Sequence, residues 1–254
     1  MKRPLGVLLD IDGTVYEADR LIPGAADAIA SLRHASIPVR FVTNTTRMPR
    51  RVLRDRLAGF GITATIDEIV TAPTAAAGWL RAEGLHPVAL HVASATEEDF
   101  TDLPRDDTHP AAVVVGDLGE AWTFARLNQA FRQVLAGGRL VALQRNRYWK
   151  TVDGLALDAG AFVAALEYAA GVSATVVGKP SQAFFTSAIR TLGNVAPEDV
   201  VVVGDDATTD VAGAKACGCT GVLVRTGKYR PEDERSNPDA VIDSLEGLPV
   251  LLGL

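Results

Sequence analysis

Cysteine is scarce in this sequence of 254 residues, which contains only Cys217 and Cys219, separated by one glycine. Two cysteines this close provide no disulfide framework, and no histidine pair at zinc-site spacing accompanies them. We interpret them as reduced thiols near a turn of a cytosolic protein. Long apolar runs are also missing: none approaches the roughly 18 residues of a membrane span, and Leu5–Leu9 is too short for a signal peptide. We therefore expect a cytoplasmic protein with no membrane partner.

Positive charge is in deficit as well. The chain has 25 Lys and Arg against 31 Asp and Glu, a net charge of −6. A nucleic-acid-binding protein usually shows the opposite balance, so we expect no nucleic-acid partner. The absence of internal repeats excludes a solenoid. The absence of G-x-G-x-x-G after the first apolar run, and of G-x-x-x-x-G-K-[ST], disfavours dinucleotide binding and a nucleotide P-loop.

Short apolar runs alternate along the chain with longer segments of helical type. The runs resemble strands buried on both faces of a parallel sheet, and the alternation predicts an α/β fold. The predicted strands are Gly6–Leu9, Val39–Thr43, Val88–Ala93, Ala112–Val115, Leu140–Leu143, Thr175–Val177, Val200–Val203 and Thr220–Val224. The predicted helices are Gly24–His34, Arg50–Phe60, Thr74–Glu83, Thr123–Ala136, Ala159–Ala170 and Ser181–Gly193.

Four polar segments follow predicted strands, and ligands of open α/β sheets bind beyond the carboxyl ends of the strands. Singly, each is ambiguous, because Asp12, Asp205 or Asp206 could cap a helix and Lys179 could be solvated. Asp117 ends a similar strand, but Trp122 stands where the later acid would be, and we interpret Asp117 as a turn residue. The four segments are Asp10-Ile11-Asp12-Gly13-Thr14, Thr43-Asn44-Thr45, Gly178-Lys179-Pro180, and Gly204-Asp205-Asp206 with Asp210 four residues further on.

Taken together and in this order, these segments resemble the four motifs of the haloacid dehalogenase (HAD) superfamily, with no departure at the motif positions. The resemblance implies a phosphatase in which Asp10 is the nucleophile and forms an aspartyl-phosphate. It implies Asp12 as general acid and base. Thr43 and the region of Asn44 would bind the phosphoryl group, and Lys179 would neutralise charge.

The resemblance also implies bound Mg²⁺, which prefers oxygen ligands. Asp10, the backbone carbonyl of Asp12, and Asp205 would be the ligands. Asp210 would orient water or Lys179 without itself binding the ion. For Asp206 both roles, binding the ion and orienting water or Lys179, stay open. The metal and Lys179 would together supply the positive charge that a phosphoryl transition state needs.

The spacing of the motifs predicts where a second domain is inserted. Between Thr43 and Lys179 lie about a hundred residues more than the ~30 of a βαβ crossover. We therefore expect a Rossmann-like core at 1–78 and 176–254, with an α/β cap at 79–175. A cap at this point resembles the C2-capped (class IIA) subgroup. Three stretches, Arg147–Lys150, Ala165–Tyr168 and Val224–Pro231, resemble its branch of phospholysine phosphohistidine inorganic pyrophosphate phosphatase and hydrolase-domain-containing relatives. By analogy, a homodimer through the cap is expected.

In the cap, Arg145, Asn146 and Arg147 are candidate substrate-binding residues because they suit an anionic group, although both arginines could instead be solvated. The four histidines match no motif position, and we expect them at the surface or in loops. The leading hypothesis is a Mg²⁺-dependent phosphatase of a small phosphorylated metabolite, with P–O, P–N and pyrophosphate bonds all left open. A phospho-accepting receiver-like module is disfavoured by Asp12 and by the insertion. A non-catalytic binding protein is disfavoured because every chemical position is intact.

Overall fold

The computed structural model describes residues 3–151 and 153–254, and the chain divides into two compact units. Unit 1 comprises Met1–Thr43, Arg50–Val70 and Lys179–Leu254, and unit 2 comprises Asn44–Pro49 and Thr71–Gly178. The cap domain predicted from the sequence, residues 79–175, stays a prediction. Among the described residues, no helix is both long and apolar enough to cross a membrane.

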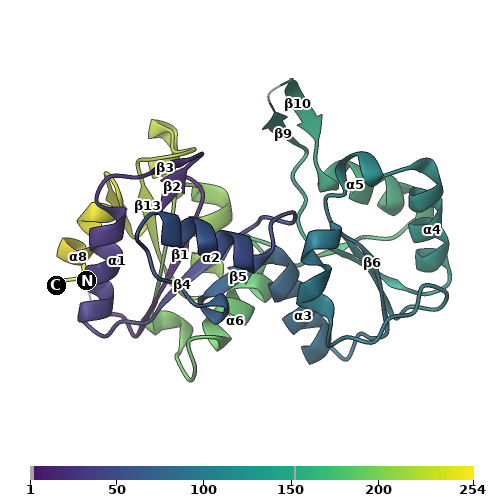
Figure 1. Ribbon diagram of the computed structural model, residues 1–254, viewed down its shortest axis with the longest axis horizontal. Coiled ribbons are helices and arrows are strands. Elements are labelled where there is room, and N and C mark those ends of the chain that lie inside the picture. Colours follow the sequence, from purple (N-terminus) through teal and green to yellow (C-terminus); the bar gives the residue numbers. More distant parts are fainter. Residues whose placement is uncertain (1–2, 152) are drawn as a thin grey trace. The chain divides into compact units, whose positions relative to one another are not determined.

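Unit 1 is built on a six-stranded sheet in the order β14-β13-β12-β1-β4-β5 (Figure 1). Every residue of β1 and β12 is buried, as expected for central strands of a parallel sheet covered on both faces. The strands β14, β13, β12, β1 and β4 run parallel. Their bounds are β1 (Gly6–Asp10), β4 (Val39–Thr43), β5 (Ile69–Thr71), β12 (Val200–Gly204), β13 (Thr220–Val224) and β14 (Ala240–Ile242).

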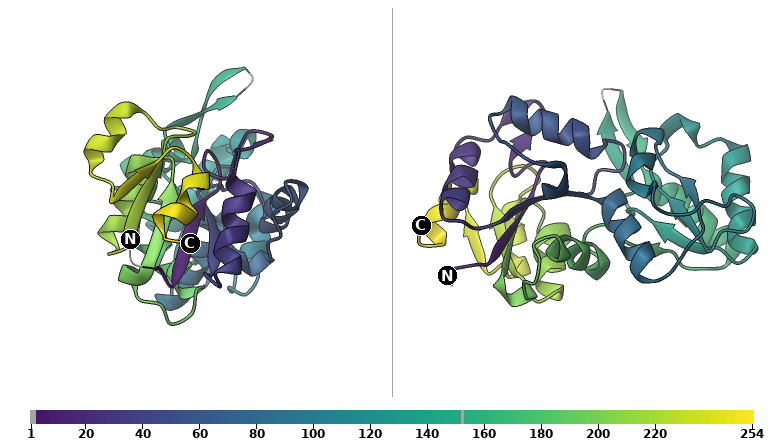
Figure 2. Two further views of the ribbon diagram at one scale, coloured as in Figure 1. Left: turned by 90° about the vertical axis from the view of Figure 1, so that its left-hand side faces the viewer. Right: turned by 60° about the horizontal axis from the view of Figure 1, so that its bottom comes forward.

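Helices cover both faces of this sheet (Figure 2). Helix α1 (Ala25–His34) packs against α8 (Leu248–Leu251), while α6 (Gln182–Arg190) packs against α7 (Gly213–Ala216). Helix α2 (Arg50–Gly59) connects β4 to β5. Directly after β1, the short strands β2 (Tyr16–Glu17) and β3 (Arg20–Leu21) form an antiparallel hairpin.

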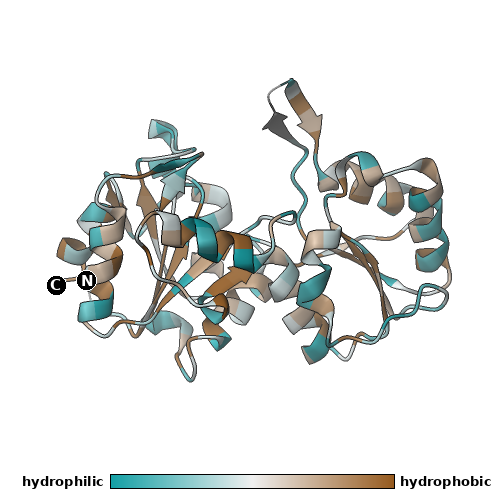
Figure 3. Ribbon diagram, in the orientation of Figure 1, coloured by the Kyte–Doolittle hydropathy of each residue, from teal (hydrophilic) through white to brown (hydrophobic). Residues whose placement is uncertain are grey.

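Unit 2 has its own parallel sheet, in the order β11-β8-β7-β6. Its strands are apolar (Figure 3), and a cluster that includes Val113, Leu140 and Val163 forms the core. The strands are β6 (Val88–His91), β7 (Ala112–Val115), β8 (Arg139–Ala142) and β11 (Thr175–Val176), with a separate antiparallel hairpin of β9 (Tyr148–Thr151) and β10 (Gly154–Leu157). The helices are α3 (Ala72–Ala82), α4 (Phe124–Leu135) and α5 (Ala159–Ala170).

Two predicted helices differ from the structure by two or more residues at one end. Helix α3 begins at Ala72 rather than Thr74, because Thr71 caps it and Pro73 is tolerated in a first turn. Helix α6 ends at Arg190, three residues before Gly193. The strand that precedes Lys179, β11, pairs with β8 in unit 2.

Candidate active site

Neighbouring strands bring the first and last sequence motifs together. In unit 1, Leu9 of β1 pairs with Val203 of β12, and Asp10 pairs with Val42 of β4. Asp10, the last residue of β1, therefore lies beside the end of β4 and beside the residues that follow β12. Thr43, the last residue of β4, is buried. Asp205, directly after β12, is only 1% exposed. The carboxyl edge of the sheet thus holds three of the four predicted motifs.

Lys179 supplies the fourth motif, although its preceding strand belongs to unit 2. Its Nζ donates hydrogen bonds to Asp10 Oδ1 at 2.5 Å and to Asp210 Oδ1 at 2.6 Å. The lysine is 6% exposed and Asp210 is 1% exposed, so these are buried ion pairs. Such pairs are strongly coupled, because removing one partner leaves an uncompensated buried charge.

A second feature is a compact group of carboxylates. Oxygen atoms of Asp10, Asp205 and Asp210 all lie within 4.8 Å of one another. Asp210 Oδ1 accepts from Lys179 and its Oδ2 accepts from the backbone N–H of Asp206 at 3.3 Å. Asp205 Oδ2 accepts from the backbone N–H of Lys228 at 2.7 Å, whereas Asp205 Oδ1 is buried with no hydrogen-bond partner.

Burial and mutual repulsion raise the pKa of each of these carboxyl groups. Burial raises the pKa of Asp10 to about 6, with Lys179 opposing the rise and Asp205 adding to it. Burial, followed by repulsion from Asp10, raises the pKa of Asp210 to about 7. The pKa of Asp205 is raised to about 6, again chiefly by burial. Burial would lower the pKa of Lys179, but the two carboxylates outweigh it and the net shift is upward. The site therefore has more negative charge than Lys179 alone can balance.

The chemistry of this donor set fits a divalent cation. Three carboxylates in mutual reach are the hard oxygen ligands that Mg²⁺ and similar ions prefer. A buried carboxylate oxygen without a partner is costly, and Asp205 Oδ1 is such an atom. A cation at this position would satisfy that oxygen and offset the repulsion among the carboxylates.

The loop after β13 was missed as part of the site. Two glycines let it approach Asp205: a Cβ at Gly13 or at Gly227 would lie 2.1 or 2.0 Å from Asp205 Oδ2, and both residues have positive φ. The Thr226 hydroxyl donates to the Gly13 carbonyl at 2.5 Å, and Lys228 Nζ lies 3.6 Å from Asp206. The sequence of this loop entered the resemblance to the class IIA branch, but no pattern in it assigned a role to Thr226 or Lys228.

The remaining acidic motif residues differ in environment. The Asp12 side chain is exposed, and the loss of part of its solvent shell still raises the pKa of its carboxyl group. Asp206 Oδ1 accepts from the backbone N–H groups of Thr208 and Thr209, so it caps the wide π-helical turn η5 (Ala207–Ala212). That turn carries Asp210 back to the end of β12. A Cβ at Gly204 would lie 2.3 Å from the Asp210 carboxyl carbon, so this glycine leaves the room that Asp210 occupies.

The remaining substrate-binding candidates belong to unit 2. Asn44 lies next to Gly178, where an added Cβ would be 2.8 Å from its Oδ1. Arg145 forms an ion pair with Glu167 at 2.6 Å. Asn146 and Arg147 are exposed at the start of the β9–β10 hairpin.

The expectation for the histidines is wrong at His91. This residue ends β6, is 2% exposed, and its Nε2 lies 2.7 Å from Gln133 Oε1. Its ring stacks on Trp122, which stacks in turn on Phe162. The hydrogen bond to Gln133 and the stacking on Trp122 allow the His91 imidazole to be buried in the core of unit 2. Asp117 does form the expected turn, by accepting from the Gly119 N–H at 2.8 Å, and it also pairs with Arg47 at 3.0 Å.

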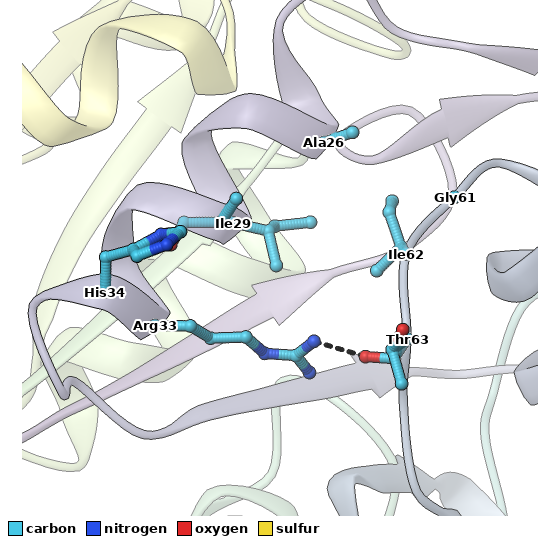
Figure 4. A pocket seen from close by; sticks show the side chains of 8 residues that line it. Ala26, Ile29, Arg33, His34, Gly61, Ile62 and Thr63 are labelled. Atoms are coloured by element: carbon cyan, nitrogen blue, oxygen red, sulfur yellow. Dashed lines mark hydrogen bonds between the residues drawn. The ribbon is translucent and has the colours of Figure 1, made fainter.

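A cavity of ≈ 370 Å³ in unit 1 lies between α1 and the chain after α2. Arg33 reaches from α1 to the Thr63 carbonyl there, and Ile29 and Ile62 form apolar walls (Figure 4). None of its lining residues is a motif residue. It is therefore a structural feature of the helix packing rather than part of the carboxylate site.

A parallel sheet whose carboxyl edge holds this set of aspartates and a buried lysine defines a hydrolase of the haloacid dehalogenase type. A family model described as haloacid dehalogenase-like hydrolase matches residues 7–103, and one described as HAD-hydrolase-like matches residues 176–248. The chain belongs to this family, and its homologues place it among the class IIA hydrolases.

The similar proteins cover nearly the whole chain. Human haloacid dehalogenase-like hydrolase domain-containing protein 2 is 45% identical over 233 residues, which is 91% of this chain and 88% of the relative. Human phospholysine phosphohistidine inorganic pyrophosphate phosphatase is 37% identical over 257 residues, 97% of this chain and 94% of the relative. Among solved structures, the p-nitrophenyl phosphatase from Archaeoglobus fulgidus is 30% identical with a TM-score of 0.89, covering 98% and 99% of the two chains.

Proposed function

We propose that this chain is a Mg²⁺-dependent phosphatase that hydrolyses a small phosphorylated metabolite through an aspartyl-phosphate on Asp10. The family and the phosphatases among its relatives support the reaction class. The observation that carries the proposal is the buried contact of Lys179 with Asp10, beside an Asp205 oxygen that has no partner. Lys179 attracts the phosphate's negative charge, and a cation held by Asp205 would do the same beside the Asp10 carboxylate.

Asp10 is the nucleophile in this proposal. One of its carboxylate oxygens attacks phosphorus, a new P–O bond forms, and the bond from phosphorus to the leaving group breaks. Lys179 keeps Asp10 ionised against the effect of burial and lies where it would also attract phosphoryl oxygens. Thr43, buried at the end of β4, and Asn44 directly after it would bind the phosphoryl group.

Mg²⁺ would be held by Asp10, the backbone carbonyl of Asp12 and Asp205. Bound there, the ion would neutralise the carboxylates and stabilise charge on the transferring phosphoryl group. Asp205 fits a ligand because its Oδ1 is buried without a protein partner. Asp210 fits an orienting role better, because both of its oxygens already accept hydrogen bonds from the protein. Asp206 Oδ1 already accepts hydrogen bonds from the turn that it caps, which favours a role near the ion without direct ligation.

Asp12 is the proton carrier. In the first step its proton goes to the leaving oxygen. In the second step Asp12 takes a proton from water as the water oxygen attacks phosphorus, and the bond to Asp10 breaks. The raised pKa of Asp12 suits the first of these tasks, because a fraction of the carboxyl groups must be protonated when substrate binds. Its exposure leaves the carboxyl accessible to both partners.

Unit 2 would act as the cap that selects the substrate, with Arg145, Asn146 and Arg147 as the candidate contacts. The pairing of Arg145 with Glu167 makes Arg147 the stronger candidate for an anionic group. The proposal further places the enzyme in the cytoplasm as a homodimer formed through this unit. Light scattering on the purified chain and on unit 2 surface variants tests the dimer.

The reaction class is tested by phosphate release from p-nitrophenyl phosphate. We expect activity with Mg²⁺, loss with a chelator, and loss in Asp10→Asn. Undiminished turnover in Asp10→Asn would overturn the nucleophile assignment. A panel of phosphate esters, phosphoramidates of lysine and histidine, and pyrophosphate, compared by kcat/KM, would identify the bond type. The phosphoramidates and pyrophosphate are included because the 37% identical relative is named for those bonds.

A further inference from the structure

The hairpin after the Asp12 motif has a non-glycine residue with positive φ at its tip. Tyr16 pairs with Leu21 and Glu17 pairs with Arg20, so Ala18 and Asp19 form its tip. Ala18 has a φ of +48°, a left-handed conformation that is unfavourable for a residue with a Cβ. A two-stranded hairpin is marginally stable by itself, and a tip of this kind persists only where neighbouring groups hold it.

Arg56, on helix α2, makes three contacts with this hairpin. Its guanidinium donates to the Ala18 carbonyl and pairs with Asp19 Oδ1 at 2.5 Å. The guanidinium carbon also lies 4.6 Å from the centre of the Tyr16 ring, within the range of a cation–π contact. A single exposed ion pair contributes little, but here one side chain contacts the base, the tip carbonyl and the tip carboxylate of the same hairpin.

The hairpin is joined to Asp12 through the backbone. The Gly13 N–H donates to the Tyr16 carbonyl at 2.7 Å, and Asp12 and Tyr16 form a β-bridge. Tyr16 is 0% exposed and packs on Phe60 at 5.5 Å between ring centres. A shift of Tyr16 would therefore move the peptide that carries the Asp12 side chain. The Asp12 side chain itself is exposed, so the burial that fixes Asp10 does not fix it.

We propose that Arg56 is a positioning residue for proton transfer, which holds the hairpin and through it the Asp12 carboxyl against the leaving-group oxygen. The inference rests on the proposed role of Asp12. It adds to that role because the residue that would hold Asp12 in position lies on a different element, 44 positions away in sequence. Proton transfer needs hydrogen-bond reach, so a small displacement of the acid lowers the rate much more than it lowers binding.

The test compares two substrates of nearly the same shape, p-nitrophenyl phosphate and phenyl phosphate, by kcat/KM, which reports the steps up to leaving-group release. Nitrophenolate leaves without a proton, whereas phenolate needs one. In Arg56→Ala we expect the loss for phenyl phosphate to exceed that for p-nitrophenyl phosphate by about tenfold. Arg56→Lys, which keeps a donor for Ala18 and Asp19, should recover part of the difference.

Arg54→Ala is the matched control, because Arg54 lies on the same helix and pairs only with the neighbouring exposed Asp55 among the contacts described. It should leave the ratio of the two substrates unchanged. Hydrogen exchange of the backbone amides at 13–22 gives a second readout, and we expect faster exchange in Arg56→Ala than in Arg54→Ala.

Equal losses for both substrates in Arg56→Ala, with Asp12→Asn showing the unequal loss, would overturn the inference while leaving the proposed function standing. Equal losses in Asp12→Asn would instead show that Asp12 is not the acid, which is a failure of the proposed function. Unchanged exchange at 13–22 in Arg56→Ala would also overturn the inference.

Discussion

The backbone N–H of Lys228 donates to Asp205 Oδ2 at 2.7 Å, which leaves Asp205 Oδ1 buried and without a protein partner. One oxygen of the candidate ligand is thus fixed by a loop 23 residues further along the chain, and the other remains for a cation. The loop makes this contact because Gly227 and Gly13 have no side chains between it and Asp205.

The first prediction concerns that loop. Gly227→Ala should weaken Mg²⁺ binding by about 10- to 100-fold, as the loss of groups that orient a metal ligand commonly does. The added Cβ would lie 2.0 Å from Asp205 Oδ2, so either the loop or the carboxylate must shift. Isothermal titration of Mg²⁺ measures the change.

Gly193→Ala is the control for the backbone. Gly193 has a φ of +93°, comparably unfavourable for alanine, but an added Cβ there meets nothing within 4 Å. It should lower stability without changing the affinity for Mg²⁺. Equal metal affinities for the two variants would show that the Gly227 loop does not orient Asp205.

The second prediction separates the two buried aspartates. Asp205→Asn should abolish measurable Mg²⁺ binding and with it the rise in unfolding free energy that the ion gives, about 2.7 kcal/mol at a hundred times the Kd. Asp210→Asn should retain binding, weakened by about 10- to 100-fold, because Asp210 is engaged by Lys179 and by the Asp206 N–H. The reverse order of affinities would make Asp210 the ligand and Asp205 the orienting residue.

The third prediction concerns His91 in unit 2. Desolvation lowers the pKa of this histidine, as does Arg126, while the hydrogen bond to Gln133 and the charge of Asp107 oppose the shift. Because the folded-state pKa is depressed, the unfolded state binds the proton more readily. The contribution to stability is therefore present above the unfolded pKa of about 6.5 and is lost as pH falls below it.

Urea unfolding followed by tryptophan fluorescence measures this contribution, since all three tryptophans fall in the sequence of unit 2. Between about pH 7.5 and 5.5, wild type should lose stability relative to His91→Gln by at most ~1.4 kcal/mol per pH unit, the limit for one proton. His34→Gln, at an exposed histidine, should follow wild type. Parallel curves for wild type and His91→Gln would contradict a buried neutral imidazole.

Much of the fold could be predicted because its central elements are long, apolar and strongly patterned. Val200–Val203 is a run of four valines, and it could only be a buried strand or the middle of a helix. The strands and α-helices that were missed are short: β9, β10, α7 and α8 have four residues each, β5 and β14 have three, and β2 and β3 have two. Elements of this length carry no periodicity, and they form because neighbouring elements hold them.

The parts of the site that could be predicted were those with a chemical signature. Asp10, Lys179 and Asp205 combine charge with a strand end, and the structure brings them within reach of one another. Lys228 contacts Asp205 through its backbone N–H, which any residue except proline possesses, so the residue type gave no signal for this contact. His91 was misjudged because a histidine's partner, here Gln133 on another element, is visible only after folding.

The central claim is that Asp10 becomes phosphorylated and that Asp12 assists both steps. In Asp12→Asn, p-nitrophenyl phosphate should still phosphorylate Asp10, because nitrophenolate needs no proton, while hydrolysis of the aspartyl-phosphate is slowed. Stopped-flow mixing of Asp12→Asn with excess p-nitrophenyl phosphate should therefore give a burst of one nitrophenolate per active site. Borohydride trapping after the burst should convert Asp10 to homoserine. Continued turnover with no burst, and with Asp10 unmodified, would contradict the account.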